Sequence, residues 1–263
     1  MSGAWPAPAR RRRSTDRAAA LVGVGVAVAL AVVHLAHGTT QHVLGPQYPP
    51  LPQDARYVRM LPPVVTSASG PHAFMHVEGG VPVRYDPCRP IHYVVNAAGG
   101  PPETMQVVQQ AVTSISQNTG LSFVSDGATD EPVGADRRSV QVDRYGNRWA
   151  PVLIGFAPAG AAGLTTEIAG LGGSAVVTTR IGARLVTGTI TLSSDEYGRL
   201  STRGDQQEQT TIQLHELGHV VGLAHVDDAG QLMWAQNRGQ VLYGQGDLAG
   251  LAEAGRGPCF RDT

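Results

Sequence analysis

The chain has 263 residues, of which 42% are hydrophobic, and a formal net charge of -1 at pH 7. This length supports one hydrophobic core once an N-terminal extension is set aside, so we expect one domain. The near-neutral charge, with no basic patch in the folded part, argues against a nucleic-acid partner. The 33 glycines, 18 prolines and 5% aromatic residues favour a loop-rich secreted domain over a compact helical bundle.

The N-terminus has the pattern of a membrane-targeting segment. Residues 1–17 include four consecutive arginines, Arg10 to Arg13, and residues 18–36 are almost wholly apolar. The positive-inside rule would keep residues 1–17 in the cytoplasm and place everything after residue 36 outside it. The apolar run is close to the roughly 20 residues that span a bilayer, and no clear small-x-small cleavage site follows. We therefore favour an uncleaved membrane anchor over a cleaved signal peptide, and either leaves the domain extracytoplasmic.

Residues 37–80 contain several prolines and little helical periodicity. This composition predicts an extended linker or a short pro-region. We expect the folded domain to occupy residues 81–263, beginning near Val81.

The predicted elements of the domain alternate between strands and helices. Ile91 to Val95 is β-branched and aromatic, which predicts a strand. Pro102 to Asn118 carries apolar residues at the 3.6-residue spacing of an amphipathic helix, and Gly120 ends it. Together with the following elements this order predicts an α+β fold. Further strands are expected at residues 121–124, 151–156, 174–179 and 187–193, a second long helix from Asp205 or Gln206 to about Val221, and a short closing helix at residues 246–254.

The second long helix contains residues with the spacing of metal ligands. His215 and His219 are four residues apart, so a helix places both imidazoles on one face. His225 cannot join them on a continuing helix, because it would lie about 9 Å further along the axis. Gly222 can break the helix, since glycine accepts a positive φ. Three histidine ligands leave one tetrahedral position open, which is typical of a catalytic zinc site.

Glu216 directly follows the first of these histidines. A carboxylate there lies beside the metal and could accept a proton from water that zinc activates. We therefore expect Glu216 to be the general base of a zinc-dependent hydrolytic reaction.

The stretch His215-Glu216-Leu217-Gly218-His219-Val220-Val221-Gly222-Leu223-Ala224-His225 resembles the signature of the metzincin metalloproteases. Leu232-Met233-Trp234 fits the methionine turn that marks this group. The short spacing from His225 to Met233 and the order of upstream elements look most like a matrixin-type catalytic domain.

The resemblance implies a metzincin-like zincin fold. In such a fold a twisted mixed β-sheet packs on two long helices, and a small C-terminal subdomain follows the active-site helix. It further implies one catalytic zinc, with Met233 beneath the site but not bound to metal. The strand at 174–179 would pair with an extended substrate, and Trp234 to Tyr243 would wall a specificity pocket. The implied activity is that of a zinc-dependent endopeptidase acting on protein or peptide substrates, as a monomer.

Three other functions remain open at this point. The chain could be a catalytically silent zinc-binding envelope module, although Glu216 would then have no chemical role. It could instead be a zinc hydrolase specialised for cell-wall peptides, or a structural envelope protein without zinc.

The two cysteines lie near the two ends of the expected domain. We expect Cys88 and Cys259 to form one disulfide that ties these ends together. Two free thiols are an alternative. Another is an inhibitory cysteine that caps the zinc, as matrixin pro-segments often provide, but the residues around Cys88 do not match that motif.

No acidic cluster has clear calcium-binding spacing. Asp126, Asp130, Asp195 and Glu196 could contribute to a structural calcium site, but we favour solvated loop positions for them.

Overall fold

The structure is a computed structural model, which describes residues 48–51, 57–134, 136–236 and 239–262. The predictions for residues 1–17 and 18–36, and for the first part of the linker, lie outside the described residues. Within the described ranges, no helix combines the length and apolar character needed to cross a membrane.

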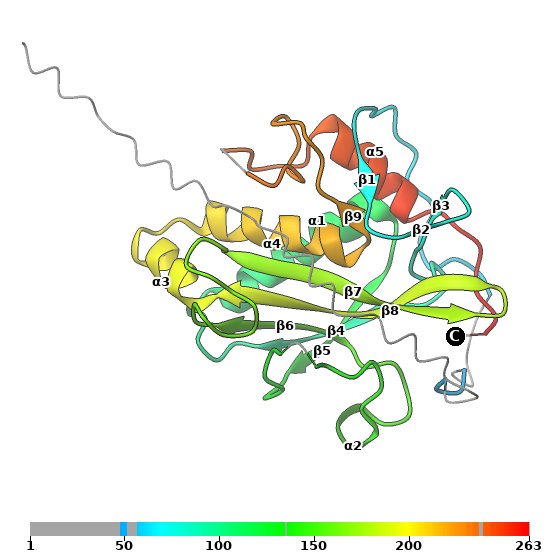
Figure 1. The fold of residues 1–263 in the computed structure, drawn as a ribbon, viewed down its shortest axis with the longest axis horizontal. Coiled ribbons are helices and arrows are strands. Elements are labelled where there is room, and N and C mark those ends of the chain that lie inside the picture. The colour runs from blue at the N-terminus through cyan, green and yellow to red at the C-terminus, as the bar shows by residue number, and fades with distance from the viewer. Residues whose placement is uncertain (1–47, 52–56, 135, 237–238, 263) are drawn as a thin grey trace, which may run out of the picture.

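The core of the domain is a five-stranded sheet with the order β5-β4-β6-β8-β7. Four strands run parallel, and β7 alone pairs antiparallel with its neighbour β8. Among the described strands, β7 therefore forms one edge of this sheet (Figure 1). The strands are β4 (Ile91–Asn96), β5 (Phe123–Ala128), β6 (Val152–Ala157), β7 (Gly170–Thr179) and β8 (Gly182–Ser193).

Two long helices, α1 (Thr104–Thr119) and α4 (Gln206–Val220), pack against each other and on one face of the sheet (Figure 1). Gly120 ends α1 with a φ of 69°, as its position predicts. Asp205 caps α4 by accepting a hydrogen bond from the Glu208 N–H. The predicted α+β fold, a mixed sheet over two long helices, is confirmed.

Three shorter helices complete the domain. The short helix α2 (Val142–Tyr145) lies in the loop before β6, α3 (Ser194–Thr202) links β8 to α4, and α5 (Gln245–Ala254) closes the chain. The sequence pattern indicates only the last of them. Ser193 starts α3 by accepting a hydrogen bond from the Glu196 N–H, although residue 193 also ends a predicted strand.

Folded structure begins before the boundary that we expected at Val81. Strand β1 (Ala73–Phe74) pairs with β9 (Leu223–Ala224), and β2 (Val77–Glu78) pairs with β3 (Val81–Pro82). Such two-residue strands have no periodicity to reveal them, and the partner of β1 lies about 150 residues away along the chain. Part of the expected linker is therefore integral to the domain, next to the segment that carries His225.

The long antiparallel pair also begins earlier than predicted. We expected a strand at 174–179, but β7 starts at Gly170 and includes three glycines before Ser174. Glycine usually marks loops, which is why the pattern alone places the strand boundary too late. Two of these glycines, Gly170 and Gly172, lie directly against Glu216 of α4.

The predicted disulfide is confirmed. Cys88 and Cys259 are bonded, with 5.3 Å between their Cα atoms and 171 residues between them in sequence. Asp86 reinforces this junction, since its carboxylate accepts hydrogen bonds from the N–H groups of Cys88 and Phe260. Free thiols and a zinc-capping cysteine are therefore both wrong.

The four acidic residues considered for calcium have separate partners. Asp126 contacts His92 and Arg148, and Asp130 contacts Arg144. Asp195 accepts a hydrogen bond from the Ala159 N–H, and Glu196 pairs with Arg199. None of the four belongs to a potential metal-binding group within the part of the chain that the structure describes.

Candidate metal centre

Helix α4 presents the first two histidines to a common point. His215 and His219 are both buried, and their Nε2 atoms lie 3.1 Å apart. The four-residue spacing on a regular helix is sufficient to explain this pairing.

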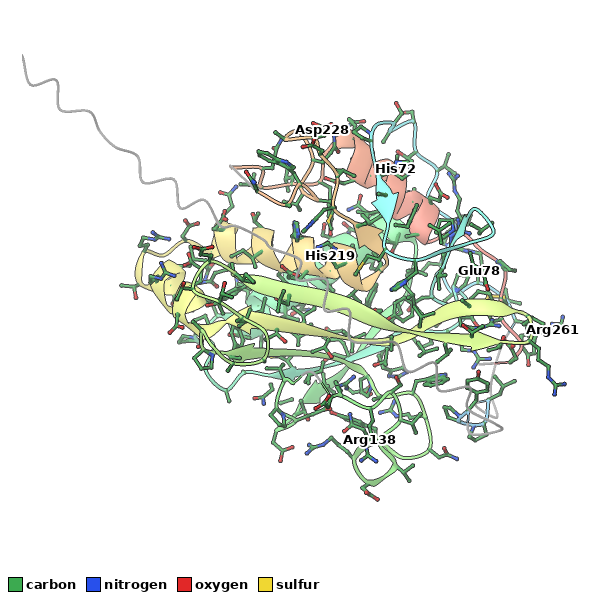
Figure 2. The ribbon with its side chains drawn as sticks, viewed as in Figure 1. His72, Glu78, Arg138, His219, Asp228 and Arg261 are labelled. Carbon is green, nitrogen blue, oxygen red and sulfur yellow. A yellow bond between two sulfur atoms is a disulfide. The ribbon has the colours of Figure 1, made fainter. Side chains whose placement is uncertain are left out.

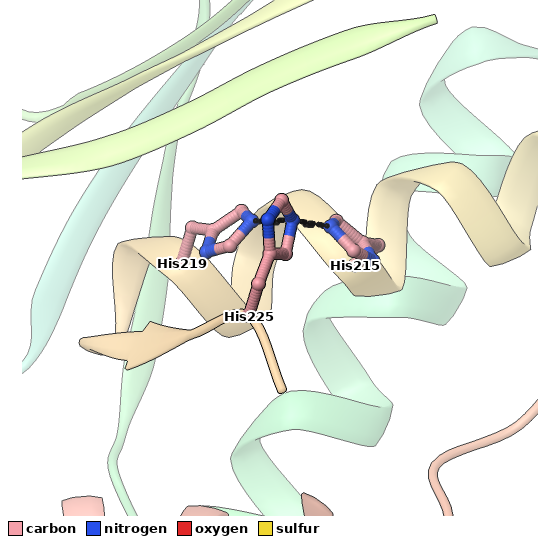
Figure 3. Close-up of side chains that lie close together, drawn as sticks. All are labelled: His215, His219 and His225. Atoms are coloured by element: carbon pink, nitrogen blue, oxygen red, sulfur yellow. Dashed lines mark hydrogen bonds between the residues drawn. The ribbon is translucent and has the colours of Figure 1, made fainter. Parts of the chain in front are cut away.

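The third histidine reaches the same point because the chain turns back after α4. The helix ends at Val220, and Gly222 has a φ of 106°, a conformation that glycine adopts without strain. The short strand β9 then leads to His225, whose Nε2 lies 3.0 Å from that of His215 and 3.1 Å from that of His219. Figure 3 shows the three rings converging beside the helix. The predicted break at Gly222 is thus confirmed, together with its consequence for His225.

The other ring nitrogens of the helical pair determine which tautomer is present. His215 Nδ1 lies 2.7 Å from the carbonyl oxygen of Leu232, and His219 Nδ1 lies 2.8 Å from that of Leu223. A carbonyl oxygen only accepts, so each Nδ1 carries a proton, and each neutral ring has a lone pair on Nε2. The 3.1 Å contact between these two Nε2 atoms therefore joins two lone pairs rather than a donor and an acceptor.

This arrangement fits a bound cation. Three nitrogens held at about 2.0–2.1 Å from a tetrahedral zinc lie roughly 3.3–3.4 Å apart, which is close to the spacing in the triad. Burial lowers the pKa of His215 well below its ordinary value and that of His219 to about 4, so both rings are neutral at pH 7. Neutral imidazole is the form that binds zinc. The donor set could therefore hold one zinc ion.

Glu216 belongs to α4, and its side chain lies between this helix and the edge strand β7. It is 2% exposed, and its carboxylate accepts a hydrogen bond from the Gly172 N–H. Burial raises the pKa of Glu216 to about 8, and the hydrogen bond offsets part of that rise. A cation bound at the three histidines would favour the ionised carboxylate, which is the form that accepts a proton.

Met233 is buried against α4 at Gly218. It is 1% exposed, and its sulfur would lie only 2.5 Å from a Cβ at Gly218, so it packs directly against α4 between the two helical histidines. The bare backbone at Gly218 makes this contact possible. Met233 thus supports the helix segment that carries the ligands.

The loop after His225 is held by a residue that sequence reasoning did not assign to the site. The buried carboxylate of Asp247, in the first turn of α5, accepts hydrogen bonds from the N–H groups of Leu232, Met233 and Gly244. The sequence indicates only that a helix begins near this residue. Asp228 accepts a hydrogen bond from the Gly230 N–H and lies on the outer loop (Figure 2).

Tyr243, in the segment after Met233, contacts α4. Its hydroxyl donates to the carbonyl oxygen of Leu214 at 2.7 Å, which ties the segment after the methionine turn to α4.

Comparison with protein families identifies the domain. The family model described as Matrixin matches residues 95–251, which is more than half of the chain and includes the triad, Glu216 and Met233. The chain belongs to the matrixin family. The resemblance seen in the sequence is thereby confirmed, and the matrixin assignment makes this domain a zinc-dependent peptidase.

Solved structures show looser similarity to this matrixin domain. An archaemetzincin from Methanopyrus kandleri has 14% identity and a TM-score of 0.41, covering 62% of this chain and 93% of that one. An archaemetzincin from Archaeoglobus fulgidus, complexed with malonate, has 16% identity and a TM-score of 0.36, covering 62% and 99%. A zinc-dependent peptidase from Methanocorpusculum labreanum has 13% identity and a TM-score of 0.35, covering 61% and 98%. No curated protein sequence matches the chain significantly.

Proposed function

We propose that this matrixin domain is a zinc-dependent endopeptidase in which His215, His219 and His225 hold the zinc. The observation that carries the proposal is the convergence of three Nε2 atoms within 3.1 Å of one another, two of them with lone pairs fixed by carbonyl partners. When bound, zinc supplies Lewis acidity, which polarises a peptide carbonyl and makes water more acidic.

Glu216 would move the proton in this reaction. Its carboxylate accepts a proton from the attacking water and later passes it to the nitrogen of the leaving amine. The Gly172 N–H holds the carboxylate in place during these transfers. The buried position of Glu216 keeps bulk water from exchanging that proton.

Strand β7 is the proposed docking edge for the substrate backbone. It pairs only with β8 among the described strands. Apart from the Thr178 carbonyl oxygen, which accepts a hydrogen bond from the Tyr48 hydroxyl, the backbone groups on its other side can pair with an extended peptide. We assign this role to residues 174–179, as the family resemblance implies. A substrate bound in this way would be read through its main chain, with side-chain preference set elsewhere in the cleft.

We also propose an extracytoplasmic location, with the chain either anchored by residues 18–36 or secreted. The N-terminal arginines and the apolar run support this location. The Cys88–Cys259 disulfide supports it independently, because such bonds persist mainly in oxidising compartments.

The test compares wild type with Glu216→Gln, both produced in an oxidising host. We expect each protein to bind one zinc ion per chain by atomic absorption. Wild type should cleave casein or quenched peptides, chelator should abolish cleavage, and Glu216→Gln should be about 10² to 10⁴ times slower.

Two outcomes would contradict parts of the proposal. Full activity in Glu216→Gln would show that another group is the base. One zinc per chain with no cleavage by wild type of any substrate, including cell-wall cross-link peptides, would favour the silent binding module.

A further inference from the structure

Strand β7 passes so close to α4 that only very small side chains fit between their backbones. A Cβ at Gly172 would lie 2.4 Å from the carbonyl oxygen of Glu216 and 2.9 Å from its Cα. Two residues along the strand, the Ser174 hydroxyl donates to the carbonyl oxygen of Val220 at 2.7 Å. Successive residues of a strand face opposite sides, so alternate small residues line the side that meets the helix.

Gly170 meets a different part of the same glutamate. A Cβ there would lie 2.7 Å from Oε1, 2.8 Å from Cγ and 2.9 Å from Cδ of Glu216, all of them side-chain atoms. The side chain of Glu216 therefore occupies the space that a larger residue at 170 would fill. The Gly172 N–H then holds the carboxylate by a hydrogen bond.

Backbone conformation does not explain these glycines. Neither Gly170 nor Gly172 is among the glycines with positive φ, so an alanine could adopt their backbone angles. A glycine inside a strand weakens it, because it adds no side-chain contacts and costs more entropy to order. Gly173, between the two, has no atom within 4 Å of its would-be Cβ. What sets Gly170 and Gly172 apart is the closeness of Glu216.

We propose that Gly170 and Gly172 are positioning residues that fix the carboxylate of Glu216 between β7 and α4. This inference rests on the proposed function, in which that carboxylate is the base. Gly172 lets the helix backbone approach and supplies the N–H donor. Gly170 leaves the space in which the carboxylate lies. The edge strand thus orients the catalytic glutamate as well as offering a docking edge to the substrate.

The first test is a double-mutant cycle read by thermal unfolding of the zinc-loaded protein. Gly170→Ala should lower Tm by about 2–4 °C in wild type, because the new methyl group displaces the Glu216 side chain. It should not lower Tm in a Glu216→Ala background, where the displaced atoms are gone. Gly172→Ala should lower Tm in both backgrounds, since the Glu216 carbonyl oxygen and Cα remain.

Gly173→Ala is the matched control, because it changes the same residue type on the same strand where space is open. It should leave Tm unchanged or raise it. An equal Tm loss from Gly170→Ala in both backgrounds, or the same loss from Gly173→Ala, would show general damage to β7 and overturn the proposal.

The second test separates positioning from folding. Gly170→Ala should lower kcat by about 10- to 100-fold with zinc content and KM unchanged, since only the base has moved. A wild-type kcat in this variant would overturn the positioning role. If wild type itself cleaves nothing, the proposed function fails, but the unfolding cycle still decides whether Gly170 and Glu216 are coupled.

Discussion

At the residue scale, Asp247 links the closing helix α5 to the three-histidine cluster. Its carboxylate accepts from the Leu232 N–H at 2.5 Å and from the Met233 N–H at 3.3 Å. The carbonyl of the same Leu232 accepts the proton of His215 Nδ1. Asp247 therefore holds the Leu232 backbone, and the Leu232 carbonyl orients the His215 imidazole. In this way Asp247 affects the histidine cluster without contacting it.

Asp247→Ala should lower the free energy of unfolding by about 2 to 4 kcal/mol, because it leaves three N–H groups without their acceptor at a buried site. It should also weaken zinc binding, measured by competition with a chromogenic chelator, since the acceptor of His215 loses its support. Asp227→Ala, at an exposed position on the same loop, is the control and should change neither quantity. Unchanged zinc affinity in Asp247→Ala would limit the role of Asp247 to folding.

At the element scale, the loop between β5 and β6 contains a buried ion pair whose arginine also bonds to the sheet. Arg137 donates to both carboxylate oxygens of Glu131, and it also donates to Thr187 on β8 and to the Pro151 carbonyl. Both side chains of the pair are 7% exposed. Tyr145 of α2 and Gln141 donate to Glu131 as well, so a segment with little regular structure has a fixed position under the sheet.

The charge of Glu131 makes this attachment sensitive to pH. Burial alone would raise the pKa of Glu131, but hydrogen bonds from Arg137, Tyr145 and Gln141 outweigh it and hold the pKa below the ordinary 4.5. Because the folded-state pKa is the lower one, the charged network stabilises the fold above about pH 4.5. That contribution is lost as pH falls through the folded-state pKa.

We therefore expect Glu131→Gln to be less stable than wild type at pH 7, and the difference to shrink as the solution is made more acidic. Urea unfolding at pH 7, 5 and 3.5 measures this directly. Asp143→Asn, on the same loop but without an ion pair to Arg137, should show a pH dependence like that of wild type. A Glu131→Gln deficit of the same size at every pH would mean that packing, not charge, holds the loop.

At the scale of the whole molecule, the two ends of the domain meet at one junction. The disulfide joins Cys88 to Cys259. Cys88 lies just before β4, the first strand of the five-stranded sheet, and Cys259 lies just after α5. Arg59 adds contacts from the preceding segment, since its guanidinium donates to the carbonyls of Gly255 and Gly257. The sheet, both long helices and the metal-binding loop all lie within the covalent ring that this bond closes.

Opening that ring should destabilise the whole fold. In the chain-entropy model a closed loop of this length stabilises the folded state by about 3 to 5 kcal/mol. A Cys88→Ser, Cys259→Ser protein should therefore lose that amount by urea unfolding, and wild type in reductant should match it. The double variant should not respond to reductant. Equal stability of wild type with and without reductant, after thiol titration confirms reduction, would contradict the prediction.

The sequence by itself determined the spacing of the three histidines and the two long helices, and it left the disulfide as one of several possibilities for the two cysteines. The histidine spacing and the helices depend on local pattern, because His215 and His219 share a helix face and Gly222 permits the turn. Two cysteines by themselves do not require a bond between them. Tertiary structure alone decided the pairing of β1 with β9, the support of Leu232 by Asp247, and the glycines that face Glu216. In those cases the partner belongs to a different element of the chain, so its identity depends on which elements pack together. Local sequence periodicity does not predict that packing.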